Sequence, residues 1–150
     1  MPDGIELAVY AGLFLAAFMA ATILPMQSEA VLVALLLTES YPTWLLLTVA
    51  SVGNVAGSVV NWGLGRTIER ARNWRYFPVK ETALRRAQKW YALYGRWSLL
   101  LSWVPIVGDP LTVVAGVMRE RFWFFLPLVT LAKTIRYAAL AFATIELAAR

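Results

Sequence analysis

The sequence contains no cysteine and no histidine. These absences exclude disulfides, thiol nucleophiles and imidazole bases, and they remove the usual ligands of transition metals. We therefore expect no metal site, no cofactor and no enzymatic activity. Charge is also scarce, since Asp, Glu, Lys and Arg make up only 15% of the 150 residues.

Apolar residues dominate what remains. They account for 60% of the chain, and the mean hydropathy of +0.62 is far above that of an average soluble domain. This composition predicts an all-α, multi-pass integral membrane protein. A chain of this length accommodates one membrane domain, which we place over residues 1–150.

Three apolar segments are long enough to span a bilayer, which takes about 20 helical residues. They are Ile5–Leu24, Trp44–Gly65 and Phe122–Ile145. Three further apolar stretches are too short to cross alone, and these are Ala30–Leu37, Trp97–Val107 and Leu111–Met118. We expect the short stretches to belong to helical hairpins.

Two similar breaks, 80 residues apart, interrupt the apolar runs. In both, an acid follows a proline four residues later, in PMQSE (25–29) and in PIVGD (105–109). We expect the hairpin tips to contain Pro25, Gln27, Ser28, Pro105, Gly108 and Pro110. Non-helical backbone at membrane depth is tolerated where protein buries it or a water-filled cavity meets it. A proline kink, or a tight loop between ordinary short helices, is the alternative interpretation.

A basic segment separates the two breaks. Residues 66–96 contain nine Lys or Arg and two Glu, a local net charge of +7, so we expect them on the cytoplasmic side. Their second part has apolar residues at helical spacing, which predicts an interfacial amphipathic helix or, equally well, a solvated linker helix. The protein's own lipid surface is the nearer anionic partner, and we expect no binding to nucleic acid.

The order of elements repeats along the chain. A hairpin and a full span occupy about 5–65 and again about 97–146, joined by the basic amphipathic segment 66–96. Because 66–96 and Arg119–Arg121 are predicted to face the cytoplasm, the first hairpin opens to the outside and the second to the inside. The predicted fold is therefore all-α, with two inverted repeats, each a re-entrant helical hairpin plus a transmembrane helix. Both termini then face the periplasm.

Four ionisable residues are predicted to lie at membrane depth: Glu29, Asp109, Lys133 and Arg136. An isolated charge at the centre of a spanning helix costs about 2.5–3.5 kcal/mol. The two bases are three residues apart on one helical face, where they can pair with the tip carboxylates or receive a phosphate. A buried carboxylate also suits proton coupling. Structural pairing that only fixes the fold is the alternative.

The segment Trp44–Gly65 carries a stripe of small and polar residues. Gly53, Gly57, Asn61 and Gly65 recur at intervals of four, so helices can pack closely along this face. Packing within the chain or a homodimer would each use such a face. Asn54, Ser58 and Asn61 are the candidates for polar lining, and we group Arg66, the residue after Gly65, with them.

Two motifs resemble those of a known family. Pro25 and Glu29 form a proline-then-glutamate tip. A G-D-x-x-x-Y-x-x-G-R element is matched in part, with the Asp and Tyr replaced, by Gly57, Ser58, Trp62, Gly65 and Arg66. With these motifs the chain resembles the DedA family, also called the SNARE-associated or VTT-domain family, and most closely its short YqaA-like branch. The resemblance extends from about Leu13 to Tyr137.

A third motif departs from the family pattern. The family element F-x-R-F-x-P-x-x-R, followed by Ala-Gly, keeps Pro105 and Ala115–Gly116 here, but Ser102 and Gly108 replace its two arginines. In larger members those arginines are thought to handle the lipid phosphate or to couple protons. The candidates to take over this role are Asp109, Lys133 and Arg136.

The resemblance implies two facing re-entrant hairpins and movement of lipids across the membrane. Bacterial members are implicated in flipping undecaprenyl phosphate or phosphatidylethanolamine, and eukaryotic relatives scramble phospholipids. We therefore expect a lipid flippase or scramblase of the bacterial inner membrane, with membrane lipids as its partners. The alternatives are a small ion- or proton-coupled solute transporter and a membrane-organising protein that transports nothing.

Overall fold

The computed structural model describes residues 3–22, 27–71, 81–104 and 108–150, and these ranges are helical apart from short turns. The elements are α1 (Gly4–Thr22), α2 (Gln27–Leu37), α3 (Thr43–Ala71), α4 (Glu81–Tyr94), the 3₁₀ helix η2 (Gly95–Trp103), α5 (Gly108–Val117) and α6 (Phe122–Ala148). The all-α prediction is confirmed.

Among the described residues, three helices are long and apolar enough to cross a membrane. They are Gly4–Thr22, Thr43–Thr67 and Phe122–Ala148, which match the three predicted spans to within a few residues at each end. The length and composition of these helices support the prediction of a membrane protein.

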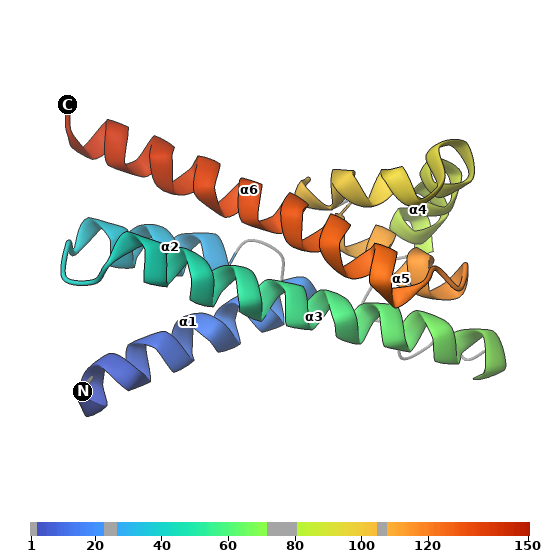
Figure 1. The fold of residues 1–150 in the computed structure, drawn as a ribbon, viewed down its shortest axis with the longest axis horizontal. Helices are drawn as coiled ribbons and strands as arrows, with labels where there is room; N and C mark the ends of the chain where they lie inside the picture. Colours follow the sequence, from blue (N-terminus) through green and yellow to red (C-terminus); the bar gives the residue numbers. More distant parts are fainter. Residues whose placement is uncertain (1–2, 23–26, 72–80, 105–107) are drawn as a thin grey trace.

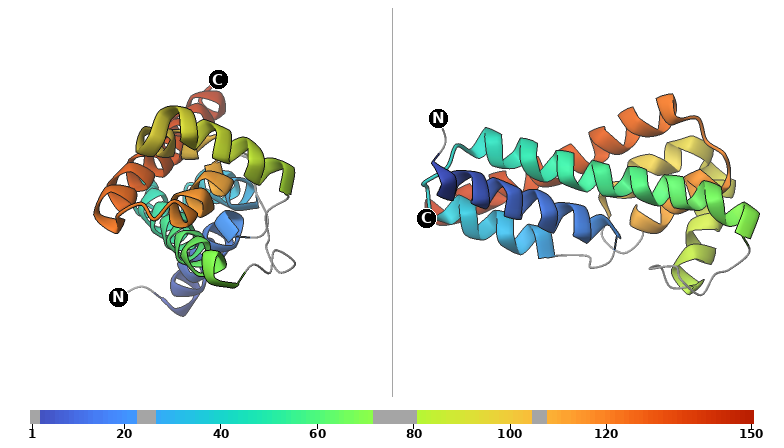
Figure 2. Two further views of the ribbon diagram at one scale, coloured as in Figure 1. Left: turned by 90° about the vertical axis from the view of Figure 1, so that its right-hand side faces the viewer. Right: turned by 90° about the horizontal axis from the view of Figure 1, so that it is seen from below.

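The two longest helices, α3 and α6, extend along most of the molecule (Figure 1). At one end α1 and α2 pack beside them, and the two chain termini lie at this same end (Figure 2). At the other end lie α4, η2 and α5. Both α2 and α5 begin near the middle of the molecule and run toward opposite ends.

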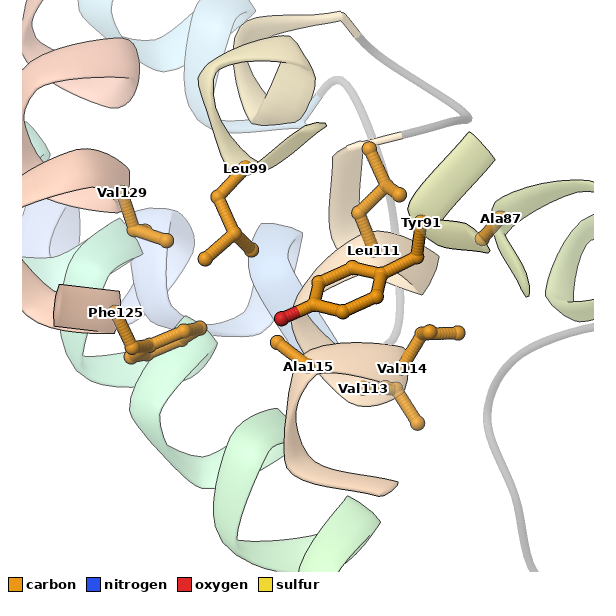
Figure 3. Close-up of a cluster of buried hydrophobic side chains, with 9 residues drawn as sticks. All are labelled: Ala87, Tyr91, Leu99, Leu111, Val113, Val114, Ala115, Phe125 and Val129. Carbon is orange, nitrogen blue, oxygen red and sulfur yellow. The ribbon is translucent and has the colours of Figure 1, made fainter. Parts of the chain in front are cut away.

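Each end of the molecule has its own apolar core. The first core joins α1, α2, α3 and α6 through residues such as Leu13, Leu32 and Leu46. The second joins α4, η2, α5 and α6, and Figure 3 shows its members Ala87, Tyr91, Leu99, Leu111, Val113, Val114, Ala115, Phe125 and Val129. Buried polar side chains also connect the helices: Ser28 and Asn54 contact Tyr137, and Asn61 contacts Thr112.

The amphipathic helix α4 packs on the second core. Ala87 and Tyr91 are buried, whereas Trp90, Leu93 and Tyr94 are exposed. The Tyr91 hydroxyl donates a hydrogen bond to the Glu120 carboxylate. Burial, followed by this bond, raises the pKa of Tyr91, so the phenol stays a protonated donor. One face of α4 therefore packs against the rest of the protein, unlike that of a linker helix surrounded by solvent.

Candidate functional site

The two predicted carboxylates stand at the starts of two short helices. Glu29 is in the first turn of α2 and Asp109 in the first turn of α5. An acid at this position is stabilised by the unpaired N–H groups and the positive end of the helix dipole. Because both helices begin near mid-length, both carboxylates are carried away from the two ends of the molecule (Figure 1).

Each carboxylate forms an ion pair with α6. Lys133 Nζ donates to Asp109 Oδ1 at 2.7 Å, and Arg136 Nη2 donates to Glu29 Oε1. The Lys133 side chain is 1% exposed, and those of the other three residues are 12–21% exposed. The structure therefore brings all four predicted residues onto one side of α6, as two separate pairs. Whether they act on a substrate stays a prediction.

A buried tyrosine connects the Glu29 pair to α3. The Tyr137 hydroxyl lies 2.9 Å from Ser28 Oγ and accepts a hydrogen bond of 2.9 Å from Asn54 Nδ2. These contacts join α2, α3 and α6 beside Arg136. Sequence analysis missed Tyr137, because an aromatic residue in an apolar span gives no sign of its hydroxyl's partners.

A second polar cluster surrounds Asn61. Its Nδ2 donates to the Ala21 carbonyl at 2.7 Å and to Thr112 Oγ1 at 3.3 Å. Thr112 in turn donates to the backbone carbonyl of Asp109 at 2.6 Å. Asn61 thus joins the end of α1 to the start of α5. Ser58 is buried too, but it donates to the Asn54 carbonyl on its own helix.

The glycine stripe of α3 packs inside the protomer. A Cβ at Gly57 would lie 2.6 Å from both the Ala21 Cβ and the Phe18 carbonyl oxygen of α1. Gly53 faces α1 in the same way, while Gly65 meets the α5 backbone at Val113. These contacts occupy the stripe, so it is not a free face for a homodimer. The structure thus shows packing within the chain, which was one of the two predicted uses of this face.

The remaining candidates divide into three groups. Pro25 and Pro105 lie outside the described residues, as does the side chain of Gln27. Pro110 is buried in α5. Arg66, which we grouped with the polar lining, is instead exposed, with its guanidinium 4.7 Å from the Trp62 ring centre. Its position in the last third of α3 places it beyond the buried polar cluster.

The VTT domain matches residues 24–146, which includes both ion pairs. The chain belongs to the VTT-domain (DedA) family. The inner membrane protein YqaA of Escherichia coli (strain K12) is 40% identical over 136 residues, covering 89% of both chains. The protein of the same name from Shigella flexneri gives the same values.

A third relative, an uncharacterized protein of Haemophilus influenzae, is 34% identical over 137 residues, covering 87% of this chain and 83% of its own. No solved structure gives a significant match. The predicted resemblance to the DedA family and its YqaA-like branch is confirmed. One relative is named as an inner membrane protein, and three of the described helices are able to cross a membrane. The predicted location in the inner membrane is therefore confirmed as well.

The structure explains one departure from the VTT-family pattern. Gly108 and Ser102 occupy the positions of the two family arginines, and they lie against each other. A Cβ at 108 would collide with the Ser102 backbone, so this packing has no room for an arginine there. Ser102 is itself fully buried. The cation that pairs with Asp109 comes from α6 instead.

Proposed function

We propose that this VTT-domain protein moves a phospholipid or a polyprenyl phosphate across the bilayer, as a flippase or scramblase. The observation that carries the proposal is the set of two ion pairs between the helix starts and the middle of α6. Four charges at this depth cost the fold stability unless they are paired. Their placement beside a buried polar cluster suits a site that receives a charged headgroup.

We further infer that α1–α2 and η2–α5 are the re-entrant hairpins of two inverted repeats. In support, α2 and α5 both begin near mid-length and run toward opposite ends, and each is followed by a helix that extends along most of the molecule. In this arrangement the first repeat supplies Glu29 and the second supplies Asp109, Lys133 and Arg136. Single-domain organisation over 1–150 is part of the same proposal.

In the proposed mechanism, the lipid phosphate exchanges with Glu29 on Arg136. A guanidinium binds phosphate and carboxylate through the same planar fork, so one can replace the other without leaving the cation unpaired. The displaced Glu29 carboxylate is our candidate for the group that carries a coupled proton. Lys133, held by Asp109, keeps a second positive charge one helical turn away. Lipid movement would then be proton-coupled.

The test is lipid movement in proteoliposomes, followed as loss of protection of a fluorescent headgroup-labelled lipid from an impermeant quencher. We expect Glu29→Gln and Arg136→Gln each to lower the rate at least tenfold. The double variant removes both charges together, so it should fold as well as the wild type and still move no lipid. Glu146→Gln, at an exposed position on the same helix, is the matched control and should keep the wild-type rate.

Two outcomes would contradict the proposal. Wild-type lipid movement in the Glu29→Gln, Arg136→Gln variant would show that the pair is structural. A folded wild-type protein that moves no lipid would favour the solute transporter or the membrane-organising protein instead.

A further inference from the structure

The helix α4 has an outer face, turned away from the core on which Ala87 and Tyr91 pack. At 3.6 residues per turn, Lys89 lies opposite the midpoint of these two residues, and Leu93 and Arg86 follow it round the helix. All three are exposed, and Leu93 is 76% exposed. The outer face of α4 therefore combines two cations with a large apolar side chain.

Along the chain, the cations of this face are followed by aromatic residues. Arg86 and Lys89 come first, and neither forms an ion pair with a carboxylate among the described residues. Trp90, Tyr94 and, in η2, Trp97 come next, and all three are exposed. The rings of Trp90 and Tyr94 stack with their centroids 5.4 Å apart. Exposed Trp and Tyr rings next to Lys and Arg are typical of a helix at the boundary of a bilayer.

The position of α4 in the fold agrees with such a location. Figure 2 shows that α4 runs across the direction of α3 and α6 rather than along it. It lies at the end of the molecule where the apolar span of α3 stops at Thr67 and that of α6 starts at Phe122 (Figure 1). When α3 and α6 cross the bilayer, a helix in this orientation and at this level lies in the plane of the membrane surface.

We propose that the outer face of α4 binds anionic lipids of the membrane surface, with Arg86 and Lys89 at the lipid phosphates and Leu93 among the upper acyl chains. Charge decides the occupant, because residues 66–96 carry a local net charge of +7 and the bilayer is the anionic surface nearest to a helix at this level. The long stems of Arg and Lys allow their charges to reach the headgroups while their methylene groups stay beside the chains.

A second copy of the chain is a poorer occupant of this face. In a two-fold symmetric contact both subunits contribute the same patch, so the cations of one α4 would meet those of the other. Like charges brought together in this way repel each other. The proposed lipid site is separate from the two ion pairs of α6, and lipid can bind there without being moved across the membrane.

The first experiment measures the depth of the outer face. The sequence has no cysteine, so a nitroxide is attached to Leu93→Cys of the full chain in nanodiscs of phosphatidylglycerol and phosphatidylcholine. Its collisions with oxygen, which concentrates among acyl chains, are compared with its collisions with a water-soluble nickel chelate. Ile135→Cys, at an exposed position within the α6 span, is the lipid reference, and Arg150→Cys, exposed at the chain end, is the water reference. We expect position 93 to resemble the lipid reference.

The second experiment measures the preference for anionic lipid. A fluorophore on Leu93→Cys is quenched by a small fraction of doxyl-labelled phosphatidylglycerol or, separately, doxyl-labelled phosphatidylcholine, both in a phosphatidylcholine host. Each Lys or Arg near an anionic surface favours binding about fivefold, so phosphatidylglycerol should quench at the lower concentration by at least that factor. The preference should also shrink as the salt concentration rises, because salt screens the attraction.

A matched pair of variants then assigns the preference to the cations of α4. Arg86→Gln combined with Lys89→Gln should lower the preference for phosphatidylglycerol at least fivefold while leaving quenching by phosphatidylcholine unchanged. Arg150→Gln removes a cation from an exposed position at the other end of the molecule and should keep the wild-type preference. Both exchanges keep a long polar side chain at an exposed position, so the fold should tolerate them.

Three results would overturn the proposal. The first is a label at position 93 that is as accessible to the nickel chelate as the water reference, which would show a solvated helix. The second is an equal preference for phosphatidylglycerol with and without Arg86 and Lys89. The third is strong spin–spin broadening at position 93, which would show that a second copy covers this face. All three concern binding at α4, so they are distinct from a failure of lipid movement in proteoliposomes.

Discussion

At the scale of single residues, Lys133 shows how a charge is accommodated in this molecule. Its ammonium group has lost its water and has one carboxylate partner at 2.7 Å, Asp109. Breaking such a pair leaves an uncompensated buried charge, which typically costs about 3–5 kcal/mol. Replacing both partners by neutral groups removes that penalty.

We therefore predict that Lys133→Met lowers the apparent melting temperature in detergent strongly, and that adding Asp109→Asn recovers most of the loss. The measurement is the fraction of protein that keeps its elution volume after heating. Arg150→Met removes a cation from an exposed position and serves as the control. A loss with Lys133→Met no larger than that of the control would contradict the stabilising role of the pair.

Tyr137 has a similar role without a charge. Tyr137→Phe would take a partner from both Ser28 and Asn54 while leaving the ring in place. Unsatisfied buried polar groups cost about 1–3 kcal/mol each, so we expect a clear loss of thermal stability. Tyr94→Phe, at a residue that is 54% exposed, should change little in the same assay. Equal stability of the two variants would argue against the polar link.

At the scale of elements, α3 organises the packing because its small residues let neighbouring helices approach closely. Gly53 and Gly57 meet α1, and Gly65 meets α5. One helix therefore holds both α1 and α5 against it. A larger side chain at one of these glycines would force the backbone of α3 away from that of the neighbouring helix. A change of side-chain rotamer could not remove the clash.

The corresponding prediction compares two glycines on the same helix. Gly57→Leu should abolish the folded, monodisperse protein, because its Cβ alone would collide with α1. Gly63→Leu should express and elute normally, since a Cβ at Gly63 meets nothing within 4 Å. Size-exclusion profiles of the two variants give the answer. Normal folding of Gly57→Leu with a change only in oligomeric state would restore the dimer interpretation.

Those helices whose formation depends on the length and hydrophobicity of the segment were predictable from the sequence. The three long helices match the predicted spans closely, because about 20 apolar residues permit little else in a membrane. The 3₁₀ form of η2 was not predictable, since it depends on packing against α5 and α6. For the site, the need to neutralise buried charges indicated the four ionisable residues, but which acid pairs with which base is a matter of three-dimensional position.

At the scale of the whole molecule, the exposed basic residues of α4 and the two chain termini lie at opposite ends. The exposed basic residues Arg85, Arg86 and Lys89 belong to α4, at the far end from both termini. By the positive-inside rule, we predict that the α4 end faces the cytoplasm and that the termini face the periplasm.

Because the sequence contains no cysteine, single introduced cysteines test this orientation cleanly. In intact cells an impermeant maleimide should label Asp3→Cys and Ala148→Cys, both exposed at the terminal end, but not Arg86→Cys. Permeabilised cells provide the control, in which all three should react. Labelling at position 86 in intact cells would refute the orientation and remove the argument for inverted repeats.

The placement of both bases on α6 also bears on how the chain is made. Synthesis proceeds from the N-terminus, so both acids emerge before the helix that neutralises them, and Glu29 precedes its partner Arg136 by 107 residues. Until α6 is made, residues 1–121 contain both acids but neither of the cation partners found in the finished fold. The insertion of the last helix is therefore the step that commits the whole chain, and a ribosome that stops before Lys133 releases a product with two unmatched acids in its interior.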